Sequence, residues 1–277
     1  MKIVILTFDL PEANIATHRL LRGLGGEVSG IIHSTSILPG KSNNMATLDL
    51  GRRLGWRYGA AWQMHRWLAQ AGALSLRLRG RPAGYGSLRA LAREAGIPLV
   101  ATANAHSGDA LDSLKRWQPD LIISNYFNQV IRQPILEVPT IGTINMHPAL
   151  LPRNRGLMPC FWAMAVGDDK TGATVHWIDE TLDTGNIILQ DALAIEPDDT
   201  VISLSQRCSE LGADLLLRAI DMLREGPVPG FVQDETRRTY QSWPTPGGLR
   251  RFRKRGYRYG SPAEMWKQGA RSQAPLA

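Results

Sequence analysis

The sequence contains few cysteines and no long apolar run. Cys160 and Cys208 are the only two cysteines among 277 residues, too few for a disulfide framework or a Cys-rich zinc site. No stretch approaches the roughly 20 apolar residues of a membrane-spanning helix. The apolar start between Lys2 and Asp9 is too short for a signal peptide, and no small-residue cleavage site follows it. We therefore expect a globular cytoplasmic protein without a membrane span.

The first predicted turn contains no glycine. Apolar periodicity predicts a strand over Lys2–Phe8, a helix over Pro11–Leu24 and a second strand over Glu27–His33. Such a β-α-β opening predicts a parallel sheet. A dinucleotide-binding turn needs glycines so that the backbone can approach a pyrophosphate. Since TFDLPEANIA has none, the sequence disfavours an NAD-dependent dehydrogenase.

Strands and helices alternate again from about residue 98. The pattern predicts strands and helices over Pro98–Ala101, Gly108–Trp117, Asp120–Ser124, Thr140–Met146, Met158–Val166, Gly172–Ile178, Asn186–Ile195 and Thr200–Arg224. The expected fold class is α/β, with an open, mostly parallel twisted sheet and helices on both faces. We expect residues 1–226 to form this domain, and residues 227–277 to be a short, basic extension over its surface.

Basic residues are concentrated in two segments. The formal net charge is +7; residues 41–95 hold ten basic and two acidic residues, and residues 237–277 hold ten and one. Such segments could attract the phosphates of a nucleotide, a nucleic acid or a lipid headgroup, or could be solvated arginine-rich faces. Within the first, a helix is predicted over Ala46–Ala71. Its Trp56, Trp62 and Trp67 interleave with arginines and indicate either a nucleic-acid or membrane-surface element or a helix that packs on the domain.

The stretch LDTGNIILQ, residues 182–190, has the Asp-Thr-Gly sequence of retroviral-type aspartic proteases. Those enzymes need two aspartates that share one proton. This chain has a single Asp-Thr-Gly, and its α/β pattern contradicts an all-β protease. Asp183 therefore belongs either to an ordinary strand-entry turn or to a different kind of active site.

Asn145 and His147 stand two apart at the end of a predicted buried strand, INMH. A period of two directs both side chains to one face, and ligands of open α/β sheets bind at the carboxyl ends of strands. Pro148 keeps His147 out of helical geometry. An amide can hold a developing oxyanion, and an imidazole can exchange a proton near neutral pH. Alone, such a pair is more often turn-forming; a loop carboxylate from Asp183 would complete an acid–imidazole–amide cluster.

Taken together, INMHPALLPRNRGLMPCFWAM and TGATVHWIDETLDTGNIILQ resemble the formyltransferase family. The family pattern, Asn-x-His-Pro/Ala-x-Leu-Leu-Pro, Arg-Gly, Thr-Gly and Asp-x-Gly, is matched from about Pro98 to Glu196. The resemblance implies formyl transfer from 10-formyltetrahydrofolate to a primary amine, without a metal. It implies that Asn145 and a protonated His147 stabilise the oxyanion. Asp183 would keep His147 charged and help to move the amine proton.

The resemblance also implies where the folate lies. Backbone groups of the NYFNQVI segment would bind the pteridine, and the loop before Asp183 would close over it. The implied folate-binding residues are Phe127, Asn128, Gln129, Val130, Ile131, Ile178, Asp179 and Thr181. For Val130 and Ile131, plain core packing is an equally good interpretation.

The identity of the amine is the least determined part. The sequence favours a small molecule, such as an amino-sugar nucleotide or another specialised-metabolite amine, whose phosphates Arg153 and Arg155 would bind. The first alternative is an RNA-borne amine, as in methionyl-tRNA formyltransferases, although residues after Ile195 do not pattern as the extra barrel domain of those enzymes. The second alternative is a non-catalytic RNA- or membrane-binding protein on the same scaffold. The oligomeric state is left open.

Overall fold

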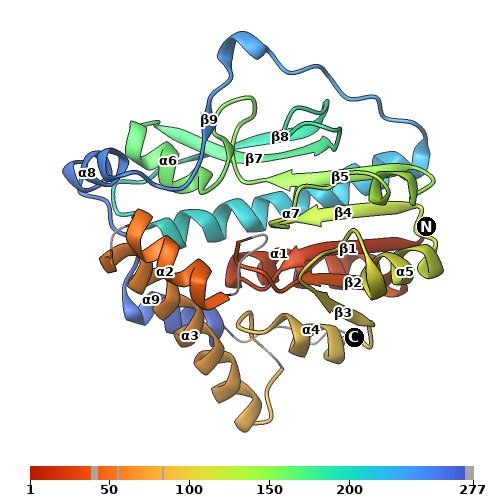
Figure 1. Cartoon of the computed structure of the whole chain (residues 1–277), viewed down its shortest axis with the longest axis horizontal. Coiled ribbons are helices and arrows are strands. Elements are labelled where there is room, and N and C mark those ends of the chain that lie inside the picture. Colours follow the sequence, from red (N-terminus) through yellow and green to blue (C-terminus); the bar gives the residue numbers. More distant parts are fainter. Residues whose placement is uncertain (39–42, 55, 83, 272–277) are drawn as a thin grey trace.

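The structure, a computed structural model, describes residues 1–38, 43–54, 56–82 and 84–271. Its main sheet has seven strands, and a small second sheet has two (Figure 1). The strands of the main sheet are β1 (Ile3–Phe8), β2 (Val28–Ser34), β3 (Leu99–Thr102), β4 (Leu121–Asn125), β5 (Gly142–His147), β7 (Lys170–Trp177) and β8 (Ile187–Ala194). The second sheet pairs β6 (Arg155–Gly156) with β9 (Tyr240–Gln241). The helices are α1 (Pro11–Leu24), α2 (Asn43–Leu54), α3 (Trp56–Leu78), α4 (Leu88–Glu94), α5 (Gly108–Trp117), α6 (Pro159–Val166), α7 (Val201–Glu225), α8 (Pro246–Lys254) and α9 (Pro262–Gly269).

The main sheet is open and mostly parallel, as predicted. Its strand order is β3-β2-β1-β4-β5-β7-β8. The pairs from β3 to β5 are parallel, whereas β7 pairs antiparallel with both β5 and β8. The parallel strands therefore end at one edge, where the loops that follow β4 and β5 lie together.

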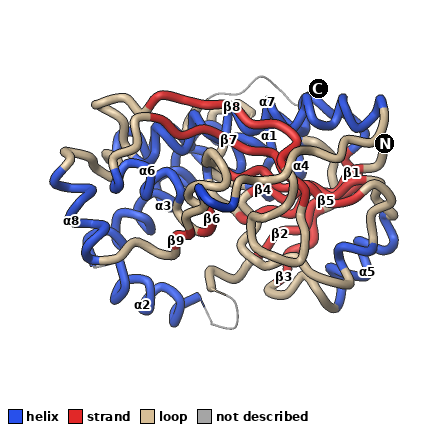
Figure 2. Tube along the Cα trace, turned by 90° about the horizontal axis from the view of Figure 1, so that it is seen from above, coloured by secondary structure: helices blue, strands red, loops and turns tan. Residues whose placement is uncertain are grey.

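Helices cover both faces of this sheet. Alternate residues of β1 belong to two different cores: Ile3 and Ile5 pack with α1 and α7, and Val4 and Leu6 pack with α5. Figure 2 shows α7 and α5 on opposite sides of the strands. Burial on both faces explains why β1 is a continuous apolar run, IVILTF.

The tryptophan-rich segment packs on the domain. In place of the one helix predicted over Ala46–Ala71, α2 and α3 are present, with the break at Gly55 outside the described residues. A Cβ on Gly59 would lie only 3.3 Å from the Cα of Gly51, so these small residues allow the two helices to touch. Trp62 is 8% exposed and joins a third core, whereas Trp67 is 77% exposed. The side chain of Trp56 lies outside the described part.

The C-terminal segment is more than a surface extension. Helix α8 packs on α6, and α9 packs along α3 (Figure 1). Leu249, Phe252 and Met265 of these two helices are buried. Helices α8 and α9 of the predicted surface extension therefore also contribute apolar faces to the core. None of the described helices is long and apolar enough to cross a bilayer.

Candidate active site

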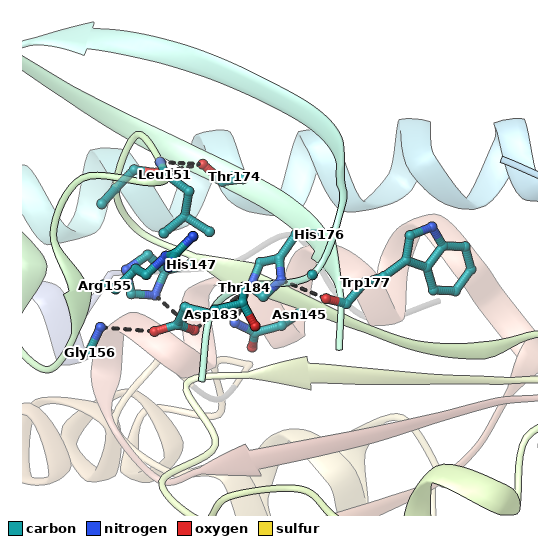
Figure 3. Close-up of polar contacts among 12 residues, drawn as sticks. Asn145, His147, Leu151, Arg155, Gly156, Thr174, His176, Trp177, Asp183 and Thr184 are labelled. Atoms are coloured by element: carbon teal, nitrogen blue, oxygen red, sulfur yellow. Dashed lines mark hydrogen bonds and ion pairs between the residues drawn. The ribbon is translucent and has the colours of Figure 1, made fainter. Parts of the chain in front are cut away.

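Three side chains from two distant parts of the chain meet at the carboxyl end of β5. Asn145 and His147 lie on β5, and Asp183 comes from the loop between β7 and β8. His147 Nδ1 lies 3.7 Å from Asp183 Oδ1, and both side chains are less than a tenth exposed. Figure 3 shows Asp183 beside His147, with the amide of Asn145 below it. The structure thus brings together the three residues that the sequence singled out.

Several contacts hold Asp183 in place. Its backbone is left-handed, with φ of 56°, an uncommon conformation for a residue with a side chain. Its Oδ2 accepts a hydrogen bond from the Gly156 amide at 2.9 Å. Its carbonyl and that of Gly185 accept from Gln233 Nε2 at 2.9 and 2.8 Å. A Cβ on Gly185 would lie 1.8 Å from the Trp177 carbonyl oxygen, so the loop needs glycine there.

Both ring nitrogens of His147 face an acceptor. Nε2 lies 2.9 Å from the carbonyl oxygen of Asn154, and Nδ1 faces the Asp183 carboxylate. A doubly protonated ring can therefore donate from both sides. Asn154 is itself fixed, because its backbone N–H donates to the Thr239 hydroxyl at 2.8 Å. Thr239 of the C-terminal segment thus holds Asn154, whose carbonyl oxygen faces His147.

A second histidine orients the amide of Asn145. His176 lies directly opposite Asn145 in the antiparallel β5–β7 pair. Its Nδ1 donates to the Trp177 carbonyl at 2.7 Å, so Nε2 is left to accept from Asn145 Nδ2 at 3.1 Å. Burial lowers the pKa of His176 to about 4, against a weaker opposing effect of Asp183. The neutral ring holds one amide proton of Asn145 and leaves the second proton for another acceptor.

Two cavities meet at this cluster. The smaller, of about 70 Å³, lies toward the loop after β4, and the larger, of about 250 Å³, lies toward α3 and α6. Asn145 and Asp183 line both, His147 lines the larger one, and His176 lines the smaller one. A group bound in either cavity can therefore contact the same amide and carboxylate.

Most of the expected folate-binding residues line the smaller cavity. These are Phe127, Gln129, Val130, Ile131, Ile178, Asp179 and Thr181. Asn128 differs: it lines the larger cavity, and its amide donates to the Ser36 carbonyl at 2.5 Å. Ile131 is 5% exposed and also belongs to a core cluster, whereas Val130 is 45% exposed. Core packing is thus part of the role of Ile131 but not of Val130.

The two arginines expected to bind phosphate are engaged within the chain. Arg153 pairs with Asp168. Arg155 is buried, and its guanidinium donates to Glu235 at 3.1 Å and to Gln233 at 2.7 Å. Neither arginine lines either of the two cavities. In this arrangement they organise the loop before α6, and phosphate binding would have to break these pairs.

Sequence reasoning missed two residues of the site. His176 lies in the predicted strand GATVHWI. The alternation of side chains along a strand could have indicated which face of the sheet His176 occupies. Its pairing with Asn145 was not readable, because strand register depends on the tertiary fold. Gln233 lies in a segment without periodicity, so no signal pointed to it. Within the described part of the chain, no group of His, Cys, Asp and Glu residues is arranged to hold a metal ion.

Comparison with known proteins gives a consistent result. The family model described as "Formyl transferase" matches residues 82–220, a range that includes Asn145, His147, His176 and Asp183. A methionyl-tRNA formyltransferase of Syntrophus aciditrophicus is 39% identical over 144 residues, covering 52% of this chain and 46% of that protein. One of Syntrophomonas wolfei is 38% identical over 163 residues, covering 58% and 52%. The chain spans about half the length of these curated relatives.

Solved structures show a similar fold at low sequence identity. Glycinamide ribonucleotide transformylase 1 from Symbiobacterium toebii is 21% identical, with a TM-score of 0.55 and coverage of 81% of this chain and 88% of that one. An N-formyltransferase from Helicobacter canadensis, in complex with folinic acid and dTDP-3-aminofucose, is 17% identical, with a TM-score of 0.55 and coverage of 87% and 71%. The family match spans half of the chain and includes the Asn-x-His strand and the Asp-x-Gly loop. The chain therefore belongs to the formyl transferase family.

Proposed function

We propose that this protein transfers a formyl group from 10-formyltetrahydrofolate to a primary amine. The observation that carries the proposal is the position of Asn145, His147 and Asp183 at the junction of two cavities in a member of the formyl transferase family. One cavity would hold the formyl donor and the other the amine. We further propose that residues 1–226 form the catalytic unit, completed by residues 227–277.

The geometry suggests a role for each side chain. The amine nitrogen attacks the formyl carbon, a C–N bond forms, and the carbonyl oxygen becomes an oxyanion. The free amide proton of Asn145 and the Nδ1–H of protonated His147, which lies 3.7 Å from Asp183 and makes no hydrogen bond to it, stabilise that oxygen. One such donor can contribute about 3 kcal/mol. Asp183 takes the proton from the attacking nitrogen, directly or through water, and the proton passes to N10 of the folate as the old C–N bond breaks.

The smaller cavity has features that suit the donor. Within the described residues, the backbone N–H and C=O groups of Val130 and Ile131 make no hydrogen bond, so they can pair with the polar edge of a pteridine. Apolar walls with a few polar groups suit a flat heterocycle. The cavity of about 70 Å³ holds the space of roughly two water molecules. Entry of a bicyclic ring therefore requires the loop tip at Asp179–Leu182 to move outward.

Two kinds of acceptor amine are supported by different observations. A small-molecule amine, such as an amino-sugar nucleotide, is supported by the fold shared with an enzyme crystallised with dTDP-3-aminofucose. An RNA-borne amine is supported by sequence similarity to methionyl-tRNA formyltransferases. We place the small-molecule amine first, because the fold shared with that enzyme covers 87% of this chain.

Asp183→Asn tests the proposal. The variant keeps an oxygen for the Gly156 amide but removes the proton acceptor, so formyl transfer should fall by about 10²- to 10⁴-fold. Formyl product would be measured by mass spectrometry with 10-formyltetrahydrofolate and an amine panel that includes charged methionyl-tRNA and amino-sugar nucleotides. Folinic acid binding, measured by calorimetry, should be unchanged. Asp191→Asn, in an exposed position on β8, is the matched control.

Two outcomes would overturn the proposal. The first is an Asp183→Asn variant with the activity of the wild type. The second is a wild-type protein that formylates no amine of the panel and instead binds RNA with a steep salt dependence. That second result would favour a non-catalytic binding protein.

A further inference from the structure

We infer that the larger cavity is the acceptor site, and that it takes a primary amine attached to a compact apolar group that carries no phosphate. This inference rests on the proposed function and narrows its acceptor to small-molecule amines without phosphate, so it disfavours an amino-sugar nucleotide. The cavity is in contact with all three residues of the cluster, Asn145, His147 and Asp183. An amine held there would have its nitrogen beside the carboxylate that accepts its proton.

The walls of this cavity are mainly apolar and aromatic. They are formed by Leu10, Ile37, Trp62, Tyr126, Phe127, Met146, Leu157, Met158, Phe161, Leu182, Val201, Trp243 and Tyr259, among others. Trp62 is almost fully buried, so its ring is a fixed surface. Apolar walls of this kind gain free energy from an apolar ligand group in proportion to the area that it buries.

The charges around the cavity disfavour a phosphate. Glu12 and Asp183 supply carboxylates, and no lysine or arginine is among the described residues that line it. Phosphates are normally bound by arginine, lysine or clustered backbone amides. Arg66 is near in the fold, but its guanidinium lies over the rings of Trp62 and Phe8, at 5.4 and 5.6 Å from their centroids. Among the described lining residues, a phosphate in this cavity would face two carboxylates, with His147 as the one side chain that can carry a positive charge.

Part of the wall of this cavity comes from outside the family match. Ile37 and Trp62 precede residues 82–220, and Trp243 and Tyr259 follow them. These flanking segments are tied together: His65 Nδ1 lies 3.1 Å from the Tyr259 hydroxyl, and α3 packs along α9. A Cβ on Gly269 would lie 1.9 Å from the Ala69 carbonyl oxygen, so the two helices are in direct backbone contact. The shape of the cavity therefore depends on these flanking segments as well as on the matched residues.

The size of the cavity points to the same class of ligand. A volume of about 250 Å³ corresponds to roughly eight water molecules. That space suits a group of the size of an amino-acid side chain or a short alkyl chain. Any larger part of the substrate has to lie outside.

A series of unbranched primary amines from methylamine to octylamine tests this inference. With saturating 10-formyltetrahydrofolate, kcat/KM should rise about fourfold per methylene until the cavity is full. Trp62→Ala and Leu157→Glu should each lower the ratio of kcat/KM for hexylamine to kcat/KM for methylamine at least tenfold. Leu157 is 37% exposed, so Leu157→Glu should fold even if Trp62→Ala does not. Trp67→Ala, on the same helix but 77% exposed, should match the wild type.

Calorimetry of hexylamine in the presence of folinic acid gives a readout that does not need turnover. If hexylamine binds and no amine is formylated, the proposed function fails, and with it the role of the cavity as an acceptor site; only its preference for apolar groups stands. If glucosamine 6-phosphate is formylated with a higher kcat/KM than hexylamine, or kcat/KM does not change with chain length, the function stands and this inference is overturned. Failure of hexylamine to bind wild-type protein would also overturn it.

Discussion

Replacing Gln233 with alanine should loosen the loop that presents Asp183. The Gln233 amide donates to the carbonyls of Asp183 and Gly185 and accepts from Arg155, and the side chain is 5% exposed. Its removal leaves two carbonyls and one guanidinium N–H without these partners. A buried polar group that loses its partner costs about 1 to 3 kcal/mol.

Water can reach part of the exposed loop tip, so we expect a total loss of about 2 to 4 kcal/mol in the free energy of unfolding. For a domain of this size, that corresponds to a fall of roughly 4 to 16 °C in Tm. The loop should respond more than the rest of the protein, because two of the three lost bonds belong to it. Amide exchange at residues 183–185 should therefore accelerate more than exchange in β4.

Thermal unfolding and hydrogen exchange read by mass spectrometry would measure both effects. Gln206→Ala is the matched control, because that amide donates to a single carboxylate, Glu210, on its own helix. Its Tm should change by less than about 2 °C. If Gln233→Ala keeps both the Tm and the loop exchange rates of the wild type, the C-terminal segment does not hold this loop, and the reasoning is refuted.

Three further predictions concern the same site. Burial lowers the pKa of His176 to about 4 from an ordinary 6.5, so below pH 6.5 His176 is protonated in the unfolded protein but not in the folded one. The free energy of unfolding should therefore be highest above pH 6.5 and fall by about 3 kcal/mol toward pH 4. Chemical denaturation against pH should show this slope in the wild type, and a smaller slope in His176→Gln. Arg155→Ala should lower the free energy of unfolding by about 2 kcal/mol, since it leaves the buried side-chain oxygen of Gln233 without its donor. The exposed Arg153→Ala should change it by less than about 1 kcal/mol, and equal effects of the two variants in urea titrations would contradict this difference. Gly185→Ala should lower the Tm and should lower the rate of formyl transfer at least tenfold, because its Cβ would lie 1.8 Å from the Trp177 carbonyl oxygen. Gly26→Ala, where a Cβ meets nothing within 4 Å, should change neither the Tm nor the rate.

The core of the fold was predictable because its signals are local. Continuous apolar runs gave the buried strands, and helix α1 has the predicted bounds, Pro11–Leu24. The position of Asn145 and His147 at the end of β5 followed from period-two geometry and the strand-end rule. The family resemblance placed Asp183 with them, and the structure brings the three together.

The rest of the site depends on packing that the sequence does not display. Residues 227–277 have weak periodicity, yet Leu249 and Phe252 join a core built by α6 and α3. The large cavity combines walls from three distant segments, and no local pattern indicates that Trp62 and Trp243 face the same space. Arg153 and Arg155 were assigned to phosphate from their place beside the motif, but Asp168 and Glu235 pair with them in the fold.

The shared wall of the two cavities has a kinetic consequence. Asn145 and Asp183 border both spaces, so donor and acceptor can occupy the protein together and react without a formylated side chain between them. Initial rates at varied concentrations of both substrates should then give intersecting double-reciprocal lines rather than parallel ones. An analogue that bridges both cavities should compete with each substrate.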